Sequence, residues 1–384
     1  MQKEVSTEKL PIKMWLDDLE EGAFSQAKDL ANLPVAFKHI AIMPDSHQGY
    51  GMPIGGVLAS ENAIIPNAVG VDIGCGMCSL KTDREHIDKD DLKKIMGLAR
   101  NNIPVGFNHH DNRQDEKWMP ELKGNLPISE KEYDSALHQV GTLGGGNHFI
   151  EIQKGSDGFI WIMIHSGSRN IGYTVAGHYN KKAKKIRDKE NSSAPKDLAW
   201  FSKGTEEYQL YYDEMNYCIE FALANRKLMM HRMKQNFMDV LGDVEFSDFI
   251  NKPHNFAAIE NHYDRDLIVH RKGATRARKD ELGMIPGSQG APSYIVRGKG
   301  NQDSFQSCAH GAGRVMSRTK AKKTLSVEEE SQKLEQMGVI HAVRHKSDLD
   351  EAPSSYKDIR KVMEQQQNLI DIEIELQPLA VIKG

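Results

Sequence analysis

The chain has 384 residues, of which 39% are hydrophobic and 27% are charged, and this composition excludes disordered and fibrous proteins. Its longest strongly apolar run, residues 159–164, is far shorter than the roughly 18 residues that cross a bilayer. With 50 basic and 54 acidic residues, the net charge of −4 excludes a globally basic nucleic-acid binder but leaves room for a local basic patch.

Strands and helices alternate along the chain. Apolar runs predict strands at residues 37–43, 158–165, 267–270, 294–296 and 379–382. Helical spacing of apolar residues predicts helices at 88–100 and 205–241, and the capping box Ser326-x-x-Glu329 predicts the start of another. Residues 101–130 are polar and are expected to form a loop or an insertion. The mixture indicates an α/β (α+β mixed) fold, with a β-sheet core surrounded by helices in a single large domain.

The segment MPDSHQGYGMPIGG, residues 43–56, follows the first of these strands. We expect the strand to end at Pro44 and Asp45, which would place Asp45 and His47 where functional sites often lie. The alternative is an Asx-turn at Asp45 beside a solvated His47.

The segment GVDIGCGMC, residues 70–78, combines a carboxylate and a thiol within a glycine-rich loop. Asp72 and Cys75 suit Mn²⁺, Zn²⁺ or Fe²⁺ better than Mg²⁺. Cys75 and Cys78 also form a C-x-x-C, so a redox pair or half of a zinc ribbon are competing interpretations. The ribbon requires a second C-x-x-C, which the sequence lacks.

Two further clusters follow in the middle of the chain. In GTLGGGNHFIEI, residues 141–152, the glycines could cradle phosphate, His148 is a candidate metal ligand, and Asn147 and Glu151 offer hydrogen bonds. No dinucleotide fingerprint or P-loop is present. His165 ends the buried strand at 158–165, where a lone histidine is more often a core residue, but the Ser166–Arg169 segment that follows is typical of phosphate recognition.

The C-terminal third adds more histidines and basic residues. His254 is a further candidate ligand, and a basic patch is predicted from Arg271, Lys272, Arg276, Arg278 and Lys279, near the loop Pro286–Gly290. His310 stands beside glycines, with Arg314 four residues later. The segment at 350–357 suggests that the end of the chain, with Lys383, is docked. Together the clusters predict a site for metal-assisted phosphoryl or nucleotidyl transfer.

These segments resemble the RtcB family of RNA-splicing ligases. The resemblance rests on MPDSHQGYGMPIGG, VGVDIGCGM, GTLGGGNHFIEI, HSGSRNIG, HRKGAT, IPGSQGAPSYIVRG, SCAHGAGRVMSRTKAKK, DEAPSSYKDI and the closing IKG. It implies an enzyme that joins a 2′,3′-cyclic phosphate or 3′-phosphate RNA end to a 5′-hydroxyl end, with GTP and two Mn²⁺ ions per chain, through a guanylated histidine. It also implies RNA substrates, such as tRNA halves or cleaved RNA, and an archease-like activator. The four cysteines are too few for a disulfide framework and no apolar segment is long enough to cross a bilayer, so we expect a cytoplasmic protein that does not associate with membranes.

The resemblance further implies roles for individual residues. His310 is then the nucleophile, oriented by Asp45, and Cys75 is the ligand that bridges the metals. The remaining implied ligands are Asp72, His148, His165 and His254. The implied nucleotide contacts are Asn147, Glu151, Pro286, Gly287, Ser288, Gln289, Ala312, Gly313 and Lys383, and Arg314 and the Ser166–Arg169 segment would contact RNA or triphosphate. Gln289 stands where the family usually has methionine. Competing hypotheses are a metal-dependent phosphodiesterase that releases the phosphate without ligation, and an RNA-binding subunit without activity.

Overall fold

The computed structural model describes residues 1–190 and 193–384, and its core is built from two sheets. The six-stranded sheet has the order β1-β2-β3-β4-β12-β11, formed by Lys3–Val5, Ile12–Met14, Ala36–Tyr50, Met52–Ser60, Arg265–Lys272 and Asn255–His262. The seven-stranded sheet has the order β10-β6-β8-β7-β17-β15-β14, formed by Phe246–Pro253, Gly76–Thr82, Ile160–Ser166, Phe149–Gly155, Ile370–Lys383, Ser293–Gly298 and Leu282–Ile285. Two short pairs complete the strands, β13 (Ala274–Arg276) with β16 (Ser307–Ala309) and β5 (Ala63–Ile64) with β9 (Phe201–Ser202).

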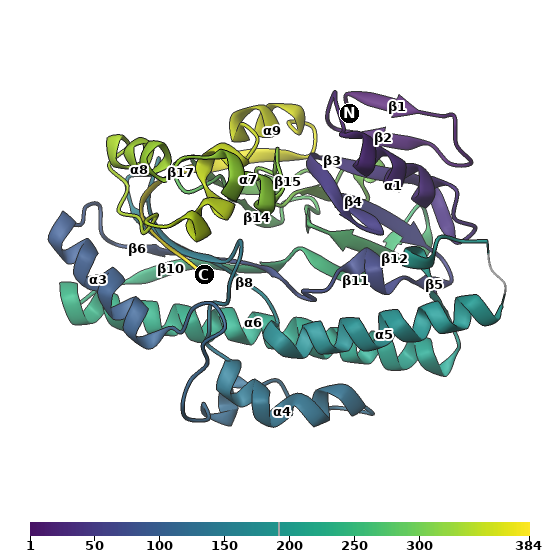
Figure 1. The fold of residues 1–384 in the computed structure, drawn as a ribbon, viewed down its shortest axis with the longest axis horizontal. Helices are drawn as coiled ribbons and strands as arrows, with labels where there is room; N and C mark the ends of the chain where they lie inside the picture. Colours follow the sequence, from purple (N-terminus) through teal and green to yellow (C-terminus); the bar gives the residue numbers. More distant parts are fainter. Residues whose placement is uncertain (191–192) are drawn as a thin grey trace.

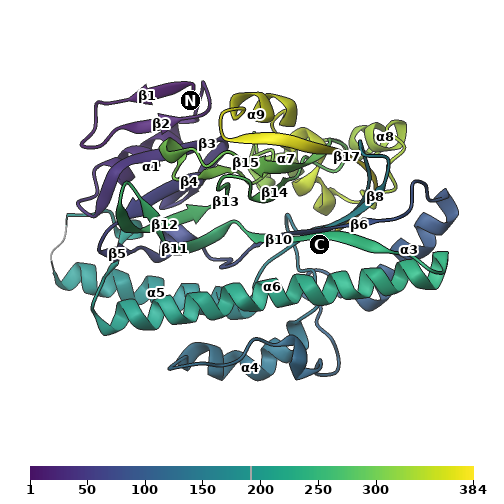
Figure 2. The same cartoon turned by 180° about the vertical axis from the view of Figure 1, so that it is seen from behind.

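Helices cover both sides of the sheets. The two long helices α5 and α6 run along one side with α4 beyond them, whereas α7, α8 and α9 lie on the opposite side (Figures 1 and 2). The α-helices are α1 (Glu21–Ala31), α2 (Pro66–Val69), α3 (Lys89–Asn102), α4 (Pro127–Gln139), α5 (Arg169–Lys189), α6 (Glu206–Leu241), α7 (Arg318–Thr324), α8 (Val327–Gln336) and α9 (Ile359–Gln365). Among the described residues, no helix is both long and apolar enough to cross a bilayer.

The predicted α/β class is confirmed, and the strongest local signals were reliable. The helix predicted at 205–241 is α6, whose first turn is capped by Thr205 Oγ1 accepting from the Tyr208 N–H, and which ends at Gly242 with φ of 77°. Ser326 caps α8 in the same way, accepting from the Glu329 N–H. The strands predicted at 158–165 and 379–382 fall in β8 and β17.

Two expectations about local structure need correction. The strand predicted to end at Pro44 continues as β3 to Tyr50, but its register with β4 jumps from Ile42–Gly56 to His47–Ile54. This bulge accommodates a proline, which cannot donate a ladder hydrogen bond, and the side chain of Asp45 is fully buried there. The second differs only in its bounds: the loop expected at 101–130 is present at 103–126, between the end of α3 at Asn102 and the start of α4 at Pro127.

Candidate functional site

Four predicted metal-ligand residues meet where neighbouring strands of the seven-stranded sheet begin or end. Cys75 precedes β6, His165 lies in β8, and His148 precedes β7, so the order β6-β8-β7 brings the three together. Cys75 Sγ lies 3.3 Å from His165 Nε2 and 3.5 Å from His148 Nε2. His254, in the turn between β10 and β11, adds an Nε2 atom 3.3 Å from that of His165. All four side chains are buried.

In His148 and His165, the ring nitrogen that points away from Cys75 is hydrogen-bonded to a backbone carbonyl. His148 Nδ1 donates to the carbonyl of Leu143 at 2.9 Å, and His165 Nδ1 donates to the carbonyl of Asn147 at 3.1 Å. Because Nδ1 of each ring donates to a carbonyl, the neutral form of each ring carries its lone pair on Nε2, the nitrogen that faces the sulfur. A carbonyl partner on the outer nitrogen is the usual support of a metal-bound histidine. The cluster therefore fits a divalent cation.

Electrostatics and a neighbouring carboxylate support the same interpretation. Burial holds the pKa of His165 and of His254 well below the usual value, so both rings are neutral, as metal ligation requires. Asp72 Oδ2 lies 3.1 Å from His148 Nε2, and its other oxygen accepts the Ser168 N–H at 3.2 Å. Thiolate, imidazole and carboxylate donors together suit a transition-metal ion rather than Mg²⁺.

Beside this cluster, His310 is held by Asp45. Asp45 Oδ2 accepts three hydrogen bonds, from His310 Nδ1 at 2.6 Å and from the backbone N–H groups of His310 and Gly311 at 3.0 and 3.2 Å. The protonated Nδ1 leaves Nε2 of His310 with the lone pair. Its ring centroid is 4.6 Å from that of His254. Gly313, at φ of 75°, is required here, because a Cβ atom would stand 2.1 Å from the Asp45 carbonyl oxygen.

His310 opens onto a pocket of about 450 Å³, which collects the residues implied as nucleotide contacts. Asn147, Glu151, Pro286, Gly287, Ser288, Gln289, Ala312, Gly313, Arg314 and Lys383 all line it, together with His165, His310 and the tip of the β3–β4 hairpin at 47–49. The implied nucleotide contacts alone come from segments that are up to 236 positions apart, as between Asn147 and Lys383. Backbone, amide and charged groups in one cavity are the chemistry that binds a nucleotide.

The far wall of the pocket is organised by Glu351, which sequence reasoning did not single out. Only 3% of this side chain is exposed, and it lies 3.2 Å from Arg314 and 2.8 Å from Arg318. It also accepts a hydrogen bond from the Tyr356 hydroxyl and lies 4.0 Å from Lys383 Nζ. The predicted docking of the chain end is thus observed, and one buried carboxylate holds a set of cationic groups in place. Its sequence signal was weak, because a glutamate in DEAPSSYK resembles any surface acid.

Glu151 also lines the pocket, from β7. Burial raises the pKa of its carboxyl group to about 8, against the opposing effects of a hydrogen bond from Gln153 and the charge of Lys383. The carboxyl group accepts that bond from Gln153 Nε2 at 2.6 Å. At neutral pH this group is therefore largely protonated and can donate as well as accept a hydrogen bond.

The structure corrects three of the five residues in the predicted basic patch, whereas Arg278 and Lys279 are exposed as expected. Arg271 is fully buried and forms a bidentate ion pair with Glu260 at 2.7 and 2.9 Å. Lys272 is buried as well, and its ammonium donates to the backbone carbonyls of Tyr50 and Asn67. Arg276 pairs with Glu281 at 2.9 Å. These residues stabilise the fold instead of offering a free cationic surface.

Three smaller expectations are also resolved. Cys78 is buried and its thiol donates to the Arg226 carbonyl at 3.8 Å, whereas Cys75 faces the histidines, so the two do not act as a redox pair here. His47 is half-buried and lines the pocket instead of standing free in solvent, and burial lowers its pKa to about 4. In the Ser166–Arg169 segment, Ser166 is buried and donates to the Leu143 carbonyl at 2.7 Å, which makes it structural.

Two polar residues in α6 hold the loops of the metal-ligand cluster and were missed. Arg226 donates to the carbonyls of Gly74 and Ser166 at 2.9 and 2.7 Å, and Asn225 donates to the carbonyl of Gly167 at 3.1 Å. Both are fully buried. An adjacent Asn and Arg on the otherwise apolar stripe of a long helix was a usable signal, because buried polar groups require partners.

Comparison with known proteins gives matches along nearly the whole chain. A family model described as "tRNA-splicing ligase RtcB" matches residues 26–384. The chain is 38% identical to "RNA-splicing ligase RtcB1" of Escherichia coli strain ATCC 25922 and 37% identical to "RNA-splicing ligase RtcB" of strain K12, with 99% of each chain covered in both cases. It is 31% identical to "tRNA-splicing ligase RtcB" of Nanoarchaeum equitans, over 98% of this chain and 95% of that protein.

Proposed function

Because this chain belongs to the RtcB family of tRNA-splicing ligases, we propose that it joins RNA ends bearing a 2′,3′-cyclic phosphate or a 3′-phosphate to 5′-hydroxyl ends, with GTP and Mn²⁺. The observation that carries this proposal is the Asp45–His310 pair, whose free imidazole nitrogen opens onto the pocket beside the metal-ligand cluster. Its substrates would be tRNA halves or other cleaved RNAs.

The chemistry follows from the position of His310. Its Nε2 atom attacks the α-phosphorus of GTP, a P–N bond forms, the bond from phosphorus to the α–β bridging oxygen breaks, and pyrophosphate leaves. Asp45 keeps the proton on Nδ1 and stabilises the positive charge that grows on the ring. A 2′,3′-cyclic phosphate must first be opened by water to give the 3′-phosphate. An oxygen of that 3′-phosphate then attacks the phosphorus of the His310-bound GMP and the P–N bond breaks. The 5′-hydroxyl attacks the activated 3′-phosphate, the phosphodiester forms, and GMP leaves.

Other residues bind and orient the reactants. Asp72, Cys75, His148, His165 and His254 would hold the two Mn²⁺ ions, with Cys75 shared between them. Bound divalent ions supply neutralisation of phosphoryl charge. Lys383, Arg314 and the backbone of the Pro286–Gly290 loop line the pocket where the nucleotide phosphates would lie, and Asn147 and Glu151 offer hydrogen bonds to the nucleoside.

The test is the covalent adduct. Incubation with Mn²⁺ and GTP labelled at the α-phosphate should label the protein, whereas label at the γ-phosphate should be lost with pyrophosphate. His310→Gln should abolish both the adduct and ligation. His39→Gln is the control, because His39 is a buried imidazole that donates to the Asp303 carbonyl and lies outside the pocket, and this variant should keep the adduct.

The competing hypotheses give different outcomes in the same assay. A metal-dependent phosphodiesterase would convert the cyclic phosphate without labelling His310, and an inactive RNA-binding subunit would do neither. We include an archease-like activator among the expected partners. Ligation that stalls after one turnover and resumes when such a protein is added would support that expectation, and sustained turnover by the chain alone would oppose it.

A further inference from the structure

Helix α5 carries a charge that contrasts with the rest of the molecule. Its 21 residues, RNIGYTVAGHYNKKAKKIRDK, contain seven Lys or Arg and one Asp, a net charge of +6, whereas the remaining 43 basic and 53 acidic residues give −10. A strongly positive helix on an acidic protein concentrates a local field that attracts polyanions.

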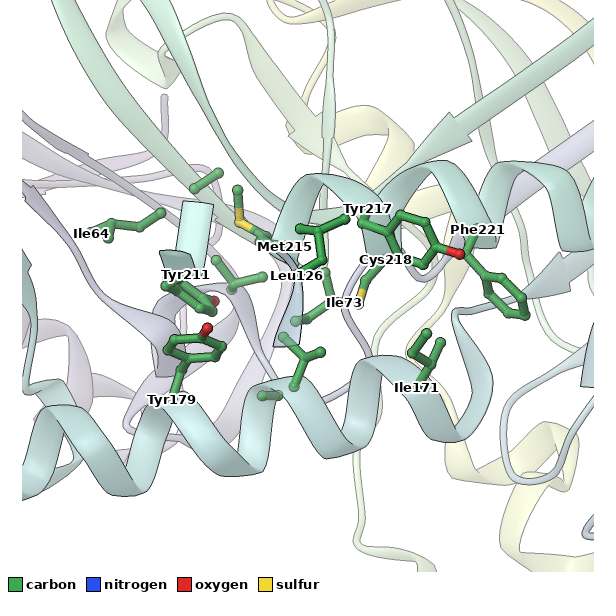
Figure 3. Close-up of a cluster of buried hydrophobic side chains, with 14 of the residues drawn as sticks. Ile64, Ile73, Leu126, Ile171, Tyr179, Tyr211, Met215, Tyr217, Cys218 and Phe221 are labelled. Carbon is green, nitrogen blue, oxygen red and sulfur yellow. The ribbon is translucent and has the colours of Figure 1, made fainter. Parts of the chain in front are cut away.

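The buried face of α5 fixes which side chains face solvent. Ile171 and Tyr179 point toward α6, and Tyr179 packs against Tyr211 of that helix with ring centroids 5.3 Å apart (Figure 3). The opposite face exposes Tyr173, which is 64% accessible, and a series at three- and four-residue spacing formed by His178, Lys181, Lys185 and Lys189. This face is thus aromatic and cationic along the length of the helix.

Several of these cations have no internal partner. Lys182 pairs with Glu207 and Lys184 with Asp197. By contrast, Lys181, Lys185 and Lys189 form no ion pair with any residue in the described ranges 1–190 and 193–384. Arg271 and Arg276 of the predicted patch differ in this respect, because glutamates neutralise their charges.

The helix adjoins the candidate site at two points. Its first residue, Arg169, donates to Thr142 Oγ1 at 3.2 Å, and the preceding Ser168 N–H binds the Asp72 carboxylate of the metal-ligand cluster. Further along, Lys184 Nζ lies 5.6 Å from the ring centroid of Tyr50, which is 59% exposed at the end of β3, next to the pocket-lining Gly49. Helix α5 therefore lies beside the metal-ligand cluster at its first turn and reaches Tyr50, next to the pocket, through Lys184.

We propose that the exposed face of α5, together with Tyr50, binds the phosphate backbone of the substrate RNA as it leaves the pocket. This inference rests on the proposed function and adds the path of the RNA strand. At 1.5 Å per residue, Lys181 lies about 18 Å and Lys185 about 24 Å along the helix from Arg169, so only an RNA longer than a few nucleotides reaches them. Exposed Tyr50 and Tyr173 offer surfaces on which unpaired bases can stack.

The test compares RNA lengths in the double variant Lys181→Ala/Lys185→Ala. Its control is Lys89→Ala/Lys93→Ala, which removes two exposed lysines from α3. Affinity for 3′-phosphorylated RNAs of about 4 and about 20 nucleotides is measured by fluorescence anisotropy over a range of salt concentrations. For the α5 variant we expect about tenfold weaker binding of the long RNA and a salt slope smaller by roughly 0.7 per lost phosphate contact. The short RNA and the control variant should bind as the wild type does.

Other outcomes separate this proposal from the proposed function. Unchanged binding of the long RNA, or equal weakening of both RNAs, would overturn the α5 path. The proposal would also be overturned if the α5 variant lost binding to anionic lipid vesicles but kept its affinity for RNA, because this face would then bind a membrane surface. GMP labelling should be unaffected by the α5 variant. If the wild type forms no GMP adduct yet the length-dependent loss is seen, the proposed chemistry fails and the RNA surface stands.

Discussion

The Asp45 carboxylate offers the sharpest test of how the nucleophile is prepared. Asp45→Asn preserves its shape but removes its charge from a fully buried position. Hydrogen bonds to a charged acceptor contribute about 1.5–3 kcal/mol and neutral ones about 0.5–1.5 kcal/mol, so the bond to His310 Nδ1 should weaken by about 1–1.5 kcal/mol. The weaker hydrogen bond matters most in the transition state, where positive charge develops on the imidazole ring of His310. Since 1.4 kcal/mol corresponds to a factor of ten, GMP transfer to His310 should slow roughly tenfold or more.

The assay is the single-turnover rate of adduct formation at saturating GTP and Mn²⁺. Glu214→Gln is the matched control, because Glu214 is an equally buried carboxylate that accepts the N–H groups of Ile128 and Ser129 at 2.7 and 3.1 Å, outside the pocket. Both variants should lose stability, but only Asp45→Asn should lose rate. An Asp45→Asn rate equal to that of the wild type, or the same loss in both variants, would refute the reasoning.

Three further outcomes are expected. Cys75→Ala should lose Mn²⁺ from both proposed positions together, as measured by metal content after dialysis. Cys78→Ser should keep its metal, because the serine hydroxyl can still donate to the carbonyl. Two ions retained in Cys75→Ala would contradict the bridging role. In the folded protein Glu151 keeps its proton to about pH 8, whereas in the unfolded chain the same group releases it near pH 4.5. The free energy of unfolding should therefore decline as the pH rises between these two values. Urea titrations should show a smaller decline for Glu151→Gln. Glu351→Gln should reduce the free energy of unfolding by about 1–3 kcal/mol. Added pyrophosphate should stabilise this variant more than the wild type, because the phosphates of the ligand replace the lost negative charge near Arg318. Equal stabilisation of both proteins would count against the role of Glu351 in holding Arg318.

The sequence allowed local elements and candidate chemistry to be predicted, but not how distant segments meet. The start of α6 was predictable because Thr205 and the acidic first turn act within a few residues. The pairing of Asp45 with His310 could be expected only through family resemblance, since nothing in the spacing of the two segments brings them together. The bulge that places Asp45 depends on the register of β4, which no local pattern in β3 encodes.

The error in the basic patch has a related cause. A sequence shows the charge of Arg271 and Arg276 but hides the partners, Glu260 and Glu281, that neutralise them in the fold. The exposed lysines of α5 were overlooked for the opposite reason, because a lysine-rich stretch is usually a solvated helix face. Only the structure reveals that α5 begins at Arg169, beside the metal-ligand cluster.

The distance in sequence between Asp45 and His310 also has a consequence for biosynthesis. The two residues are 265 positions apart. At roughly 5–20 residues per second, about 15–50 s pass on the ribosome between the addition of one and of the other. During that time the carboxylate lacks the three donors that satisfy it, so the segment around Asp45 cannot take its final buried place and the neighbouring apolar strands stay accessible to chaperones. The rate of translation through residue 310 therefore sets the earliest moment at which this part of the core can close.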